Sequence, residues 1–263
     1  MKLDLTKIIL GYNKDNIFIN INDKFELDEV QRIPIHVTSQ DIQEQLNNDN
    51  FSKCYESVGG KNNKDKSFEN ARLVPFNLPY YFLAFTEQKI PTLQQITQEY
   101  LSRFCQKSKK FSRYYQLQDH YLQLGYSDIL FTERTLTARM GRGYNSFNRE
   151  LELGLRFKQE PDLFVKYDFR DDYFNGIDLS VMFDDFLAGI ACYQDSIRAE
   201  AFKKLKETTR RNNYDKSTMI PMKINMEKPD TYKRSGDTLF FSDTMYQDVL
   251  QQIYKKEIKN DIS

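Results

Sequence analysis

Apolar residues follow a helical period through the middle of this chain. Between residues 92 and 124 they recur at steps of three and four, which predicts a helix. The same spacing over residues 132–157 predicts a second helix, interrupted or kinked near Gly141 and Gly143 and ended by Pro161. The middle third of the chain is therefore expected to be helical.

After Pro161 the pattern changes to alternating and continuous short apolar runs, which are typical of strands. A helix is expected over residues 196–211, behind the capping residues Asp195 and Ser196, and a closing helix over 244–258. This order of helix, strands, helix and strand predicts an α/β sandwich. The predicted strands span residues 163–169, 176–183, 187–193, 219–226 and 236–241.

The N-terminal part is less regular. Short β-like runs occupy residues 17–21 and 33–37, and residues 47–70 form a polar, Gly/Asn/Lys-rich stretch that predicts a flexible loop. Residues 73–85 are strongly apolar with two prolines, which favours a core-facing strand or a packed connector. We therefore expect an N-terminal α/β region over residues 1–90. Residues 91–263 should add a helical segment and an α/β core.

Composition excludes several classes of protein. The 38 basic residues equal the 38 acidic ones, so a basic surface can only be local. No apolar run approaches the roughly 20 residues that cross a bilayer, and three dispersed cysteines suit a reducing cytoplasm. Two histidines exclude a His-rich zinc site, and the chain has no phosphate-binding glycine loop. Chemistry here has to come from carboxylates, Lys, Arg and hydroxyls.

One face of the predicted helix over 132–157 is rich in arginine. At helical spacing Arg139, Arg142, Ser146 and Arg149 share this face, and Glu150 lies at its edge. Arginines beside one acid are suited to phosphate and to an outer ligand of a metal. The alternative is an ordinary solvated helix face.

Asp178 is the acid set inside an apolar β-like run. It points to the opposite side from Ile177 and Leu179, so a strand covered on both faces would bury its carboxylate. A buried carboxylate needs a hydrogen-bond partner, a countercharge or a metal. The alternative is an exposed Asp that follows the turn at Gly176.

Charge separates along the C-terminal half. Residues 160–185 hold eight acids against two basic residues, whereas 196–211 hold six basic residues against two acids. An acidic strand region beside a basic helix allows a phosphodiesterase to bind both divalent cations and a polyanion. The same distribution also balances the surface of many α/β proteins.

The order of these parts resembles the PD-(D/E)xK, or restriction-endonuclease-like, nuclease superfamily over about residues 132–255. Glu150 is similar to the family's helix acid, Asp178 to its first-strand Asp, and 188–193 to its second strand. The resemblance implies an α/β fold with a mixed sheet flanked by helices. It also implies metal-dependent cleavage of DNA phosphodiesters, with Mg²⁺ or Mn²⁺ held by Asp178 and Glu150. It leaves the first half of the chain unassigned.

The second strand departs from the family pattern, because residues 190–193 contain no acid-x-Lys. Gln194 or Asp195 could replace the acid, and Lys203 or Arg198 could replace the lysine, which gives Glu150, Asp178, Gln194 and Lys203 as the expected catalytic set. The expected DNA-binding residues are Arg139, Arg142, Arg149, Arg198 and Lys204.

Three alternatives to an active nuclease stay open. The chain could be a catalytically inactive nuclease-fold subunit or adaptor that binds nucleic acid or a protein partner, or that forms a homodimer. It could also be an interaction subunit that docks through aromatic surfaces. A third alternative is a nucleotide or small-ligand sensor that uses the arginine face.

Overall fold

The computed structural model describes seven parts of the chain and divides it into two compact units. One unit comprises Met1–Val37 and Asn50–Tyr144, and the other Thr38–Asp49 and Asn145–Ser263. Among the described residues, no helix has an apolar stretch that could cross a membrane. The described parts are residues 36–48, 77–104, 130–167, 176–184, 186–194, 219–236 and 238–260.

The first unit contains α6 (Leu78–Glu87), α7 (Leu93–Phe104) and the beginning of α9 (Leu130–Lys158). The strand or connector expected over 73–85 is wrong in its described part, which is α6. Pro79 occupies the first turn, where a missing N–H costs nothing. Because α6 is buried on nearly all sides, its sequence shows no polar face from which a helical period could be read.

Helix α7 begins with a reciprocal cap. The Thr92 N–H donates to Gln95 Oε1 at 2.8 Å, and the Gln95 N–H donates to Thr92 Oγ1 at 3.2 Å. The helix predicted from residue 92 is confirmed as far as Phe104, and the remainder of 92–124 lies outside the described residues. The Tyr144 hydroxyl of α9 donates to the Pro91 carbonyl at 2.8 Å and so holds α9 beside the start of α7.

Helix α9 runs without a break through Gly141 and Gly143, so the expected interruption is not found. Each glycine costs about 1 kcal/mol relative to alanine in a helix. Burial of the apolar side of the helix outweighs this cost, because tertiary packing supplies most of the stability of protein helices. That buried side includes Leu136, Met140, Tyr144, Phe147 and Leu151.

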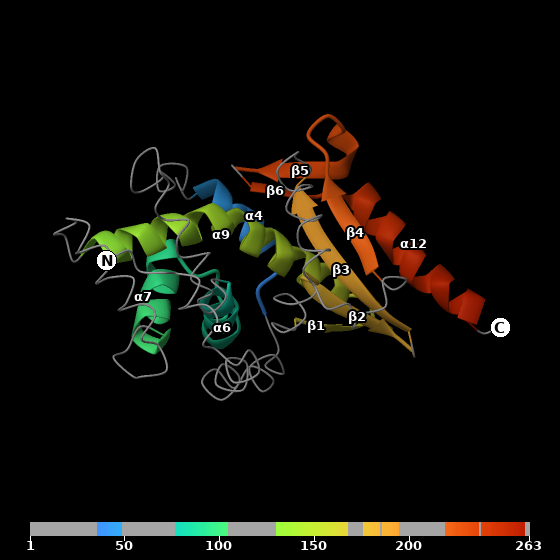
Figure 1. Ribbon diagram of the computed structural model, residues 1–263. Helices are drawn as coiled ribbons and strands as arrows, with labels where there is room; N and C mark the ends of the chain where they lie inside the picture. The colour runs from blue at the N-terminus through green and yellow to red at the C-terminus, as the bar shows by residue number, and fades with distance from the viewer. Residues whose placement is uncertain are drawn as a thin grey trace, which may run out of the picture. The chain divides into compact units, whose positions relative to one another are not determined.

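The second unit is built on a four-stranded mixed sheet in the order β1-β2-β3-β4 (Figure 1). Strands β1, β2 and β3 are antiparallel neighbours, and β4 runs parallel to β3. The mixed α/β class is thereby confirmed. The strands are β1 (Phe164–Lys166), β2 (Leu179–Phe183), β3 (Phe186–Gln194) and β4 (Met219–Ile224).

Two helices cover the same face of this sheet. A Cβ on Gly154 of α9 would lie 3.4 Å from Leu179 Cδ2, so the glycine allows helix and sheet to pack closely. Four residues further along β2, the Phe183 ring packs edge-on against Tyr254 of α12 (Asp243–Asn260), with centroids 4.7 Å apart. Since Leu179 and Phe183 point to one side, α9 and α12 share the inner face.

A second, two-stranded sheet pairs β5 (Tyr232–Ser235) with β6 (Thr238–Phe241), after the short helix η6 (Pro229–Thr231). Helix α4 (Ser39–Asn48) packs against β5, and the Ser235 hydroxyl donates to the Gln43 carbonyl at 2.9 Å. The sequence patterns above predict neither α4 nor β5.

Several expectations fall outside the described residues: the run at 17–21, most of the loop at 47–70 and the basic helix at 196–211. At the end of the run expected over 33–37, His36 and Val37 form no strand. The boundary expected near residue 90 stays a prediction. Ile90 lies between α6 and α7, and both helices belong to the first unit.

Candidate functional site

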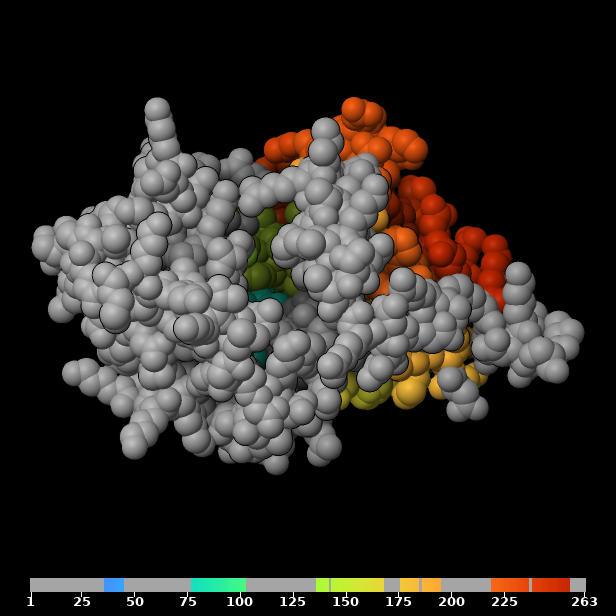
Figure 2. All heavy atoms as spheres, viewed as in Figure 1, coloured from blue at the N-terminus to red at the C-terminus, as the bar shows by residue number. Residues whose placement is uncertain are grey.

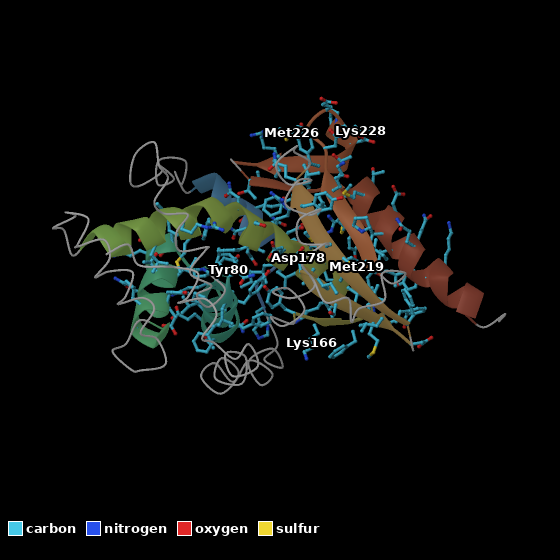
Figure 3. The ribbon with its side chains drawn as sticks, in the orientation of Figure 1. Tyr80, Lys166, Asp178, Met219, Met226 and Lys228 are labelled. Carbon is cyan, nitrogen blue, oxygen red and sulfur yellow. The ribbon has the colours of Figure 1, made fainter. Side chains whose placement is uncertain are left out.

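Asp178 immediately precedes β2 and is bound to β3 through both its backbone and its side chain. Its N–H donates to the Ile190 carbonyl at 2.8 Å, and its Oδ2 accepts the Cys192 N–H at 2.5 Å. Strand β3 continues past the end of its pairing with β2, so the Cys192 N–H would otherwise lack a ladder acceptor on that side. In Figure 3, Asp178 lies beside β3. The carboxylate therefore closes the β2–β3 ladder.

Glu150 comes from the part of α9 that belongs to the second unit. Its Oε1 accepts a hydrogen bond of 2.7 Å from the Ser146 hydroxyl, one turn earlier. Only 5% of Glu150 is exposed, so this acid is buried rather than at the edge of a solvated face as expected. A buried carboxylate requires compensation from its surroundings.

Arg149 supplies positive charge to this region. It is 6% exposed, its Nε donates to the Leu239 carbonyl of β6 at 2.6 Å, and its guanidinium lies 5.9 Å from the centre of the Phe241 ring. Burial lowers the pKa of Arg149. Coulombic interactions with Cys192, Glu150 and Asp178 oppose that lowering of its pKa.

These four residues, Arg149, Glu150, Asp178 and Cys192, form what we call the Arg149 cluster. Helix α9, the residue before β2 and the C-terminal part of β3 each contribute to it. Glu150 and Asp178 both raise the pKa of the Arg149 guanidinium.

Glu150 and Asp178 are donors of the type that a hard divalent cation prefers. Mg²⁺ in phosphate-transfer sites is usually held by one or two carboxylates, with the remaining ligands from water and phosphate oxygens. Glu150 and Asp178 provide two carboxylates of this kind. Among the described residues, no group of three or more His, Cys, Asp or Glu side chains surrounds one point. A metal there would depend on water and substrate for its other ligands.

The predicted arginine face is divided between the two units. Arg139 and Arg142 lie on the part of α9 that belongs to the first unit, and Arg149 lies on the part that belongs to the second. Arg139 is half-buried, and the Arg142 side chain lies outside the described residues. The structure therefore does not join the three in one described site.

The proposed replacements for the acid-x-Lys are only partly described. Gln194 is exposed at the end of β3, where its Cα partner is Ile224 of β4. Asp195, Arg198, Lys203 and Lys204 lie outside the described residues. Cys192, which sequence reasoning did not select, instead occupies the middle of β3 beside Asp178.

A second buried acid, Glu152, lies two residues further along α9 and was also missed. It is fully buried, and neither of its carboxylate oxygens forms a hydrogen bond in the described part of the chain. Lys233 Nζ of β5 is 3.5 Å from its Oε1, and the Ser39 hydroxyl of α4 lies near it. Burial raises the pKa of Glu152, and the cations Lys233 and Arg156 partly oppose the rise.

Glu152→Gln should therefore stabilise the protein at neutral pH. A group whose pKa is raised on folding contributes stability below its unfolded pKa, and that contribution is lost as the pH rises through the folded value. Gln removes the ionisation, so the free energy of unfolding of the variant should rise relative to that of the wild type between pH 4.5 and pH 8. Near pH 4.5 the variant and the wild type should be nearly equal. Urea denaturation at both pH values measures this, and a variant that is less stable at pH 8 would contradict it.

Comparisons with family models, curated proteins and solved structures found no match to this chain. The function therefore has to be argued from the geometry of the Arg149 cluster and from the order of the elements that build it.

Proposed function

We propose that the second unit is a nuclease-like module that interacts with DNA and hydrolyses phosphodiester bonds with the help of a divalent metal. The observation that supports the proposal is a buried Glu150 next to the buried Arg149 on α9, together with Asp178, which is hydrogen-bonded to β3 immediately before β2. Both acids raise the pKa of Arg149.

The order of elements supports the same proposal. A helix that carries a buried Glu is followed by a strand hairpin whose first strand is immediately preceded by Asp178, and β4 then adds parallel to β3. The nuclease superfamily that the sequence resembles has a Glu-bearing helix before such a hairpin. Under the proposal, the second unit is a restriction-endonuclease-like mixed sheet with flanking helices.

Each residue of the cluster has a distinct role in this proposal. Asp178 and Glu150 would hold Mg²⁺ or Mn²⁺, which when bound supplies Lewis-acid polarisation of the phosphate and lowers the pKa of water. Arg149 would offset negative charge on the phosphate with the rest of its guanidinium. The hydrogen bond from its Nε to the Leu239 carbonyl fixes the orientation of that group. Gln194, Lys203 and the basic residues Arg139, Arg142, Arg198 and Lys204 remain proposed contacts.

A second candidate is a nuclease fold that binds nucleic acid or a protein partner without cleaving. The observation that favours it is the structural use of Asp178, whose Oδ2 accepts the Cys192 N–H. This hydrogen bond is a structural role that accounts for the carboxylate without catalysis. In addition, β3 holds Ile190, Ala191, Cys192 and Tyr193 where the resemblance implies an acid-x-Lys.

Incubation of the full chain with double- and single-stranded DNA separates the two candidates. An active enzyme should nick or degrade DNA with Mg²⁺ or Mn²⁺ and be silent with EDTA. An inactive binding module should bind DNA with an affinity that falls as salt rises, whatever the metal. If the chain neither cleaves DNA nor binds it in a salt-dependent manner, the nuclease proposal and the nucleic-acid-binding form of the second candidate both fail.

A further inference from the structure

The outer face of the four-stranded sheet, opposite α9 and α12, carries a row of exposed apolar side chains. Phe164 of β1 is the Cα partner of Met182 of β2, and Met182 is the partner of Leu187 of β3. Their exposed fractions are 60%, 42% and 42%. Cross-strand partners project from the same face, so these three form one continuous strip, which we call the apolar row. Single exposed apolar residues are common, whereas contiguous ones mark interaction sites.

The apolar row occupies one end of this face only. Further along the strands Ser180 and Ala191 are buried at 7% and 4% exposure. The row lies at the tip of the β2–β3 hairpin, whereas Asp178 lies at the opposite end of β2, about 13 Å away at the usual rise per residue. Atoms of β1 and β2, yellow in Figure 2, reach the surface in that view. A partner on the row would therefore not need to touch the Arg149 cluster.

The exposed charges beside the row are acidic. Asp162 and Asp184 are both exposed, each two residues from a member of the row, whereas Lys166, on the same face of β1 as Phe164, is half-buried. Such a surface repels nucleic acid and attracts a cation-bearing partner.

We propose that the apolar row is a docking site for a protein segment that is amphipathic and basic. Its apolar side chains would cover Phe164, Met182 and Leu187, and its Lys or Arg side chains would meet Asp162 and Asp184. This combination of apolar anchors and complementary charge at the rim is the usual composition of a peptide-binding surface. The inference is independent of catalysis by the second unit.

A labelled 16-residue amphipathic peptide of Leu and Lys is the probe, and its Leu and Glu counterpart tests the sign of the charge. In fluorescence anisotropy with the full chain, the Leu/Lys peptide should bind and the Leu/Glu peptide should not. Met182→Ser should weaken binding at least tenfold. Met226→Ser is the matched control, because Met226 is 44% exposed but lies in the turn after β4. Asp184→Asn should reduce the salt dependence of binding.

Three outcomes would overturn the proposal. Equal effects of Met182→Ser and Met226→Ser would show that the peptide binds elsewhere. Absence of binding to the wild type would indicate that another part of this chain covers the row. A dimer in sedimentation that Met182→Ser dissociates would assign the row to a second copy. Circular dichroism and thermal melts of each variant establish that it is folded.

Discussion

Asp178→Asn should abolish Mg²⁺-dependent cleavage of DNA while leaving the protein folded. The amide keeps an oxygen that can accept the Cys192 N–H, so the hydrogen bond that is 2.5 Å long in the wild type can still form. It removes the charge that a hard cation requires. Loss of a residue that only hydrogen-bonds to a metal ligand lowers metal affinity or activity roughly 10–100-fold. Loss of a direct ligand should lower the cleavage rate by more than that. Initial rates on plasmid DNA over a range of Mg²⁺ concentrations measure the effect.

Two further variants separate the metal role of Asp178 from its structural one. Asp178→Ala removes the acceptor as well as the charge and should lower the free energy of unfolding by about 1–3 kcal/mol. Asp230→Asn makes the same chemical change at an exposed acid of the second unit and should leave cleavage unchanged. If Asp178→Asn cleaves as well as the wild type, Asp178 is only a ladder acceptor.

Arg149→Ala should cost about 2–4 kcal/mol of unfolding free energy, more than an exposed arginine would. The substitution leaves the Leu239 carbonyl without the donor that now lies 2.6 Å away. It also removes the cation that acts on the buried Glu150 and on Asp178. Guanidinium denaturation at pH 7 is the measurement.

The matched control is Arg234→Ala, because Arg234 is exposed on β5 and should change stability by no more than about 0.5 kcal/mol. A double-mutant cycle with Glu150→Gln tests the cause. If Arg149 compensates the charge of Glu150, its removal should cost less in the Glu150→Gln background. An equal cost in both backgrounds would assign the effect to the Leu239 bond alone.

Elements with a clear period were predictable from the sequence. The helix α9, the strands β1 to β4 and the helix α12 each follow from a stripe or run of apolar residues. Helix α6 was missed because it is buried almost all round, and a segment without a polar face carries no period. Strand β5 is four residues long and contains two basic residues, so its sequence carries little apolar signal.

Helix α4 did carry a signal that could have been used. Thr38 and Asp41 are spaced as a reciprocal cap, and in the structure the Thr38 N–H donates to Asp41 Oδ2 while the Asp41 N–H donates to Thr38 Oγ1. Arg149 is different. Its spacing placed it on a polar face of the predicted helix, but it is buried, and its hydrogen-bond partner is a carbonyl 90 residues later in the chain. No local pattern can reveal such a partner.

Because α4 contacts β5, the second unit can be completed only after β5 has been synthesised. The Ser235 hydroxyl and the Gln43 carbonyl are 192 residues apart in the chain. A ribosome that adds about 5–20 residues each second releases α4 roughly 10–40 s before its partner strand exists. Within the described residues, the meander β1–β2–β3 needs only neighbouring sequence and can pair early. During synthesis, α4, whose Ile42 is fully buried in the finished protein, must therefore wait for β5.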